Sequence, residues 1–136
     1  MFEINLKIDM NKQLKQVEDF QKAFGGPVGD KPSFPTEARC ELRQKLLQEE
    51  VLELYEGWSK GDIIEVADAI TDCLYILLGT AIEFGLQDKL EALFEEVHGS
   101  NMSKLGANGR PIYREDGKVM KGPNYYKPNL KKVLYG

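Results

Sequence analysis

Hydrophobic residues recur at helical spacing in four stretches of the chain. These stretches cover about residues 10–24, 36–58, 62–84 and 88–104, and glycines or a polar turn separate them. The segment "GGPVGDKPSFP" contains too much glycine and proline for regular structure, so it is expected to be a loop. The pattern predicts an all-α fold, a helical bundle of about four helices.

The residues after the fourth stretch follow a different pattern. Asp116-Gly117 lies between "IYRE" and "KVMK", which is typical of a short hairpin. Pro123 and Pro128 then favour an extended arm. We therefore expect one domain over residues 1–136, with a helical body over about 10–105 and a C-terminal hairpin and extended arm over about 106–136.

The third predicted helix contains the most apolar run of the chain, "DIIEVADAITDCLYILLG", residues 62–79. Three acids interrupt this run: Glu65, Asp68 and Asp72. On a helix they fall within about 60° of one another, and the remaining circumference is largely apolar. Charges in such a setting need compensation.

The second predicted helix carries another acidic group, Glu49, Glu50 and Glu53, where an apolar stripe ends. The short turn "SKGD" would bring the two acidic groups together, and carboxylates that close repel unless cations lie between them. Oxygen ligands favour Mg²⁺, with Mn²⁺ as a substitute. The alternative is a non-catalytic helical interaction module whose acids are solvated. A di-iron bundle needs Glu-x-x-His pairs, and the single histidine, His98, lies outside both groups.

Composition limits the other classes. The chain has 136 residues, 42% hydrophobic and 29% charged, as expected for one globular domain. The first twelve residues show no signal-peptide pattern, and the acids in the apolar run argue against a membrane span. Cys40 and Cys73 are too few for a disulfide scaffold, so we expect reduced thiols and a cytoplasmic protein.

Charge is unevenly distributed along the chain. Residues 1–103 have a balance of −10 and residues 104–136 one of +6. An acidic body does not resemble a nucleic-acid binder, but acids and lysines together suit a metal-bound polyphosphate. Asn101 and Lys104 continue the apolar stripe of the fourth helix, as a frayed helix end or as substrate contacts. Lys118 and Lys121 are candidates to bind phosphates; a solvated basic tail is the alternative.

The acidic groups carry a family resemblance. "EEVLE" (49–53), followed by "EVAD" (65–68), resembles the EExxE…ExxD pattern of the MazG-like nucleoside triphosphate pyrophosphohydrolases. This all-α group includes dimeric dUTPases and phosphoribosyl-ATP pyrophosphohydrolase. The segments "VEDFQKAFGGPV" and "VHGSNMSKLGANGRPIYREDGKVMKGPNYYKP" are also similar to one MazG-like branch, so the resemblance covers most of the chain.

The resemblance implies a site and a reaction. Glu50, Glu53, Glu65 and Asp68 would bind Mg²⁺, and Glu49 would be a further ligand or the base that activates water. Asp72 lies beyond the shared motif, and its role is open: near the metal it would orient a water or a ligand. The reaction would convert a nucleoside triphosphate to the monophosphate and pyrophosphate.

Two further expectations follow from the family. Its bundles are built from more than one chain, so oligomerisation, as a homodimer or homotetramer, would complete this one. The chain reads "EVADAITDC" in place of the ExxDxxYH form of phosphoribosyl-ATP pyrophosphohydrolase. This departure argues against phosphoribosyl-ATP as the substrate, which we keep as the alternative to a nucleoside triphosphate.

Overall fold

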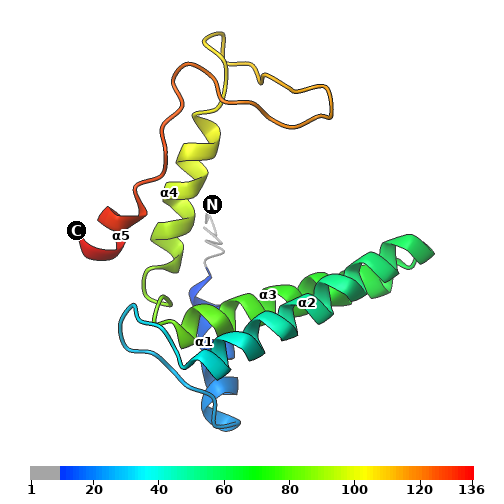
Figure 1. Cartoon of the computed structure of the whole chain (residues 1–136), viewed down its shortest axis with the longest axis vertical. Coiled ribbons are helices and arrows are strands. Elements are labelled where there is room, and N and C mark those ends of the chain that lie inside the picture. Colours follow the sequence, from blue (N-terminus) through cyan, green and yellow to red (C-terminus); the bar gives the residue numbers. More distant parts are fainter. Residues whose placement is uncertain (1–9) are drawn as a thin grey trace, which may run out of the picture. The chain divides into compact units, whose positions relative to one another are not determined.

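The computed structural model describes residues 10–136, which form five helices and no strands (Figure 1). The helices are α1 (Asn11–Ala23), α2 (Glu37–Lys60), α3 (Ile63–Glu83), α4 (Leu90–Met102) and α5 (Leu130–Tyr135). The all-α prediction is confirmed, and the four predicted helices agree with α1–α4 to within about two residues at each end. The first twelve residues, in which the sequence shows no signal-peptide pattern, lie mostly outside the described residues. Among the helices described, none is long and apolar enough to cross a membrane.

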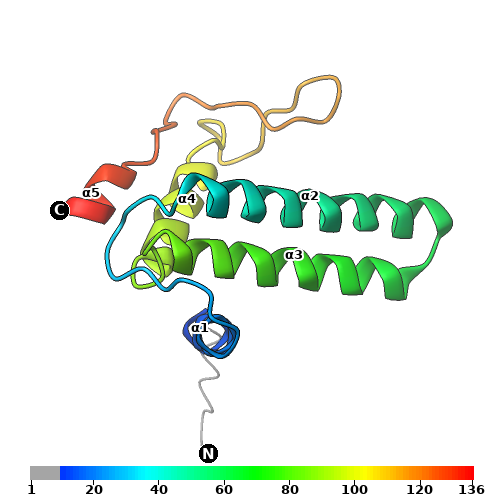
Figure 2. The ribbon, with the colours of Figure 1, turned by 60° about the horizontal axis from the view of Figure 1, so that its bottom comes forward.

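The long helices α2 and α3 form an antiparallel hairpin, which Figure 2 shows side by side. Thr36 caps the start of α2, accepting a hydrogen bond from the Arg39 N–H at 3.3 Å. Gly61 ends α2 in the left-handed region, with φ 72°, and Asp62 then caps α3 by accepting from the N–H groups of Ile64 and Glu65. Because the residue that ends α2 is followed directly by the residue that caps α3, the turn between the two helices is short.

Helix α1 packs against α3, and the buried apolar residues of the described chain lie on these two helices. The buried apolar residues are Leu14, Val17, Ala69, Ala81 and Ile82. Beside them a buried acid, Glu83, joins three helices: both side-chain oxygens bind Arg39 of α2 at 2.9 Å, and Gln21 of α1 donates to Oε2 at 3.1 Å. The Arg43 guanidinium lies 3.3 Å from the same oxygen. Polar contacts therefore hold α1 and α2 to the end of α3.

The chain divides into two compact units after Asp88. The second unit contains α4, the predicted hairpin and α5. The hairpin forms around Asp116-Gly117 with one antiparallel bridge, Tyr113 to Val119, and no extended strands. The single-domain assignment, with its boundary near residue 105, stays a prediction.

The end of the arm differs from the sequence-based expectation. The arm is not extended throughout: Asn129 accepts a hydrogen bond from Lys132 N–H and starts α5. The segment before it is fastened to α4, because Ser100 donates to the Tyr126 carbonyl at 2.8 Å and Glu96 accepts from Asn129 N–H at 3.0 Å. The prolines end before this last helix begins, so they do not prevent it.

Candidate metal and active site

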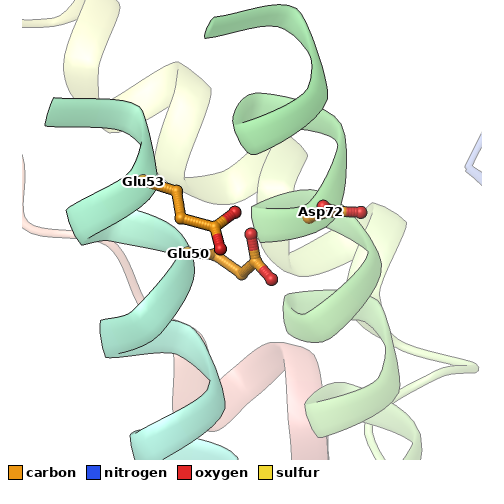
Figure 3. A group of neighbouring side chains, drawn as sticks. All are labelled: Glu50, Glu53 and Asp72. Carbon is orange, nitrogen blue, oxygen red and sulfur yellow. The ribbon is translucent and has the colours of Figure 1, made fainter. Parts of the chain in front are cut away.

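Three carboxylates meet where α2 lies against α3. Glu50 and Glu53 reach from α2 toward α3, which carries Asp72 (Figure 3). One carboxylate oxygen from each residue lies within 4.8 Å of the other two. Glu50 and Glu53 are three residues apart, so the helix places them on one face, and the hairpin brings Asp72 to that face. We call this group the carboxylate cluster.

Glu50 is the most perturbed member of the carboxylate cluster. Burial raises its pKa from 4.5 to about 7, with further contributions from Glu53, Asp72 and Asp68. Its Oε2 atom is buried and has no hydrogen-bond partner in the part of the chain that the structure describes. An ionised carboxylate in this position is costly without a positive partner.

The cluster has the chemistry of a divalent-cation site. Its donors are all carboxylate oxygens, which hard cations prefer, and no hydrogen bond from the described residues competes for the buried Glu50 Oε2. Asp68 is close enough for its charge to act on Glu50. Glu50, Glu53 and Asp72 can therefore hold a metal ion, with Asp68 nearby.

The titration of Glu50 predicts how the metal-free protein responds to pH. Below pH 4.5 this carboxyl is protonated in both the folded and the unfolded chain, so it has no effect. Between 4.5 and about 7 the unfolded chain loses the proton that the folded chain retains, and stability falls as pH rises. Above about pH 7, Glu50 is ionised in both states and the loss of folding stability reaches its full value. Because Glu50 keeps some solvent contact, we expect this loss to be at most about 3 kcal/mol.

Denaturant unfolding in EDTA at pH 5 and pH 8 measures this effect. Glu50→Gln has no carboxyl to titrate, so its stability should change less between the two pH values and exceed that of the wild type at pH 8. An equal loss of stability in Glu50→Gln and wild type would contradict the assignment of the raised pKa to Glu50.

Besides Asp68, two acids named by the family resemblance are not among the three residues of the carboxylate cluster. Glu65 is half-buried near the start of α3, and its Oε2 atom lies 3.5 Å from Lys60 Nζ. Glu49 is exposed on α2. Neither belongs to the group of three oxygens in the carboxylate cluster, so their roles as ligand or base stay predictions.

Asp72 is the residue whose role the sequence left open. It follows Asp68 by four residues and Glu65 by seven, so it shares their face of the helix. That spacing was the available signal. Its meeting with Glu50 and Glu53 depends on how far α2 and α3 are shifted along each other, and only the structure shows this. The neighbouring Cys73 thiol also has a raised pKa, chiefly through burial and then through Glu50 and Asp72.

The predicted substrate contacts lie in the second unit. Asn101 is exposed near the end of α4, and the Lys104 carbonyl accepts a hydrogen bond from Gly122 N–H at 2.9 Å. Lys118 follows the hairpin turn, and Lys121 Nζ lies 4.8 Å from the centre of the Tyr125 ring. All four keep their place as predicted substrate contacts.

Comparison with known proteins identifies the family. The family model described as phosphoribosyl-ATP pyrophosphohydrolase matches residues 17–101, well over half of the chain and the segment that contains the carboxylate cluster. A solved structure from Exiguobacterium sp. 255-15, described provisionally as an NTP pyrophosphohydrolase, is 28% identical, with 92% of each chain covered and a TM-score of 0.48. A comparison with curated proteins gives no significant match. The family match confirms the MazG-like resemblance, and the chain belongs to the phosphoribosyl-ATP pyrophosphohydrolase family of hydrolases.

Proposed function

We propose that the protein hydrolyses a nucleoside triphosphate to the monophosphate and pyrophosphate, with Mg²⁺ as cofactor and Mn²⁺ as a substitute. One observation carries this proposal: carboxylate oxygens of three residues from two helices lie within 4.8 Å of one another, and one buried oxygen among these residues has no hydrogen-bond partner within residues 10–136. A solvated acidic face does not require such convergence. A site for a cation that binds polyphosphate does.

The chain's own residues would divide the work. Glu50, Glu53 and Asp72 hold the cation, and Asp68 adds negative charge beside them. A bound Mg²⁺ supplies charge neutralisation for the phosphates and acidifies a coordinated water. Glu49, exposed on α2, is the candidate base for that water, and Glu65 a further candidate ligand. Asn101 and Lys104 are candidates to contact the nucleoside and a phosphate.

The free thiols Cys40 and Cys73 support a cytoplasmic location.

Phosphoribosyl-ATP is the second candidate substrate. The family description favours it, because the same bond type would be broken in a base-modified ATP. Against it stands the sequence "EVADAITDC", which lacks the tyrosine and histidine expected in the ExxDxxYH form. We therefore place canonical or modified nucleoside triphosphates first.

A substrate panel tests the proposed function. Canonical and damaged nucleoside triphosphates and phosphoribosyl-ATP are each incubated with Mg²⁺, and the products are resolved as monophosphate plus pyrophosphate or diphosphate plus phosphate. We expect monophosphate and pyrophosphate, and no turnover in EDTA. Turnover that survives exhaustive EDTA treatment would refute the metal requirement. No turnover of any substrate would favour the non-catalytic module.

The basic arm provides a second prediction. If Lys118 and Lys121 hold substrate phosphates, the double variant Lys118→Ala, Lys121→Ala should lose roughly tenfold or more in kcat/KM, since charge-assisted contacts contribute about 1.5–3 kcal/mol. Cation affinity, measured by calorimetry, should stay unchanged. The control Lys127→Ala, Lys131→Ala removes the same charge from exposed positions of the same arm. Equal kinetics in both double variants would return the arm to a structural role.

We also propose that the protein works as a homodimer or homotetramer. Many apolar side chains are exposed in the single chain. Near the turn between α2 and α3, Trp58, Ile63 and Ile64 are 62%, 76% and 79% exposed. A cavity of about 400 Å³ with largely apolar walls, which include Val17, Leu74 and Leu78, lies between α1 and α3. Large apolar side chains exposed in this number along α2 and α3 support burial against a second copy.

Sedimentation velocity tests this proposal. We expect the wild type to sediment as a dimer or larger at micromolar concentration. Leu74→Glu should shift it toward the monomer, because Leu74 is 56% exposed and a buried unpaired charge would be costly at an interface. A wild type that is folded and monomeric at this concentration would contradict the proposal.

A further inference from the structure

The facing surfaces of α2 and α3 follow a regular register. On each helix the facing residues are seven apart, which is two turns, so they recur on one side. The contacts pair a residue of α2 with a residue of α3 at three successive levels: Gly57 with Glu65, Glu50 with Asp72, and Arg43 with Gly79. The carboxylate cluster is therefore flanked on both sides by a pair that includes a glycine.

Gly57 allows the two helix backbones to approach on the side of the turn. A Cβ atom at this position would lie 3.0 Å from the Val66 backbone nitrogen and 3.2 Å from the Glu65 carbonyl carbon. These are backbone atoms inside a helix, so they cannot rotate away as the end of a side chain can. An alanine here forces α3 away from α2 by a few tenths of an ångström.

Arg43 controls the separation on the other side. Its guanidinium crosses from α2 to α3, where it donates to the Ile76 carbonyl at 2.6 Å and to Thr80 Oγ1 at 3.1 Å. It lies directly over Gly79, whose added Cβ would be 2.5 Å from Arg43 Nη2. A side chain at position 79 would displace the guanidinium and break this connection.

We propose that Gly57 and Arg43, the latter seated over Gly79, are positioning residues that set the separation of α2 and α3 at the carboxylate cluster, and thereby its affinity for a divalent cation. This inference rests on the proposed function. Mg²⁺ demands short, nearly octahedral oxygen contacts, so ligands from two helices must be held at a narrow spacing. Gly57 and Arg43 are not members of the carboxylate cluster, and they would act through Glu50 and Asp72.

Calorimetric titration with Mg²⁺ and Mn²⁺ tests the inference in the full-length protein. Gly57→Ala should bind Mg²⁺ about tenfold more weakly than the wild type, as found when residues that orient metal ligands are changed. Its melting temperature in EDTA should change little, because the greater helix propensity of alanine offsets the cost of moving α3 away from α2. A merely structural role would lower stability and leave the affinity of the folded protein intact.

A control and a second variant complete the test. Ser59→Ala introduces alanine two residues away at an exposed position of α2 and should bind as the wild type does. Gly79→Ala displaces Arg43 and should also weaken Mg²⁺ binding. Folded Gly57→Ala and Gly79→Ala proteins with Mg²⁺ affinity within twofold of the wild type would overturn the inference alone. A wild type that binds neither cation would overturn the proposed function and this inference together.

Discussion

Glu53→Gln should reduce kcat/KM by about two orders of magnitude or more, since a bound metal contributes several kcal/mol of charge stabilisation. Glu53 is one of three residues whose carboxylate oxygens converge, and an amide is a weaker and uncharged ligand. The fold should survive, because Glu53 is exposed and removal of one negative charge from the carboxylate cluster lowers repulsion. Asp72→Asn should behave in the same way. Asp68→Asn should also lose turnover, because the family resemblance implies that Asp68 is a metal ligand.

Single-turnover kinetics measure the rate of hydrolysis in these variants, and calorimetric titration measures their affinity for the metal. Glu41→Gln is the matched control, since Glu41 is an exposed acid on α2 outside the carboxylate cluster. It should retain wild-type turnover. Near-normal turnover in Glu53→Gln would remove Glu53 from the set of metal ligands, and normal turnover in Asp72→Asn would favour the ligand set implied by the family resemblance.

Glu83→Ala should destabilise the protein by about 3–5 kcal/mol, the cost of removing one partner from a buried ion pair. The Glu83 side chain has no solvent exposure and binds Arg39 and Gln21, with Arg43 beside it. Without the carboxylate, two arginines face each other and the Gln21 amide loses an acceptor. Since these residues come from α1, α2 and α3, the loss should loosen all three helices.

Denaturant unfolding at a fixed protein concentration measures this cost, because the stability of the proposed oligomer would depend on concentration. Glu41→Ala removes an exposed acid from α2 and should change stability by no more than about 0.5 kcal/mol. Equal stabilities of Glu83→Ala and Glu41→Ala would show that the buried network contributes nothing.

Much of the backbone could be predicted from the sequence because its signals are local. Thr36, Gly61 and Asp62 mark the ends of α2 and the start of α3 through contacts with residues no more than five positions away. The periodic apolar positions likewise report on one helix at a time. The short helix α5 was missed because two prolines nearby favoured an extended arm, and its six residues contain too few periods to reveal it.

The site was only partly predictable from the sequence. The acidic character of the facing surfaces follows from residue spacing; in the structure Glu50 and Glu53 converge, and the charge of Asp68 acts on Glu50. The inclusion of Asp72 and the separate position of Glu65 beside Lys60 depend on the register of α2 against α3. A sequence read one helix at a time does not contain that register.

The helices and their acidic faces were thus determined by contacts between near neighbours in the chain. Tertiary structure alone decided the contacts between residues far apart in sequence. Glu83 reaches Gln21 across 62 positions and Arg39 across 44, and Gly57 permits the close approach at Glu65. The physical reason is that a side chain's partner across two helices depends on how both backbones pack, and packing is set by all the contacts at once.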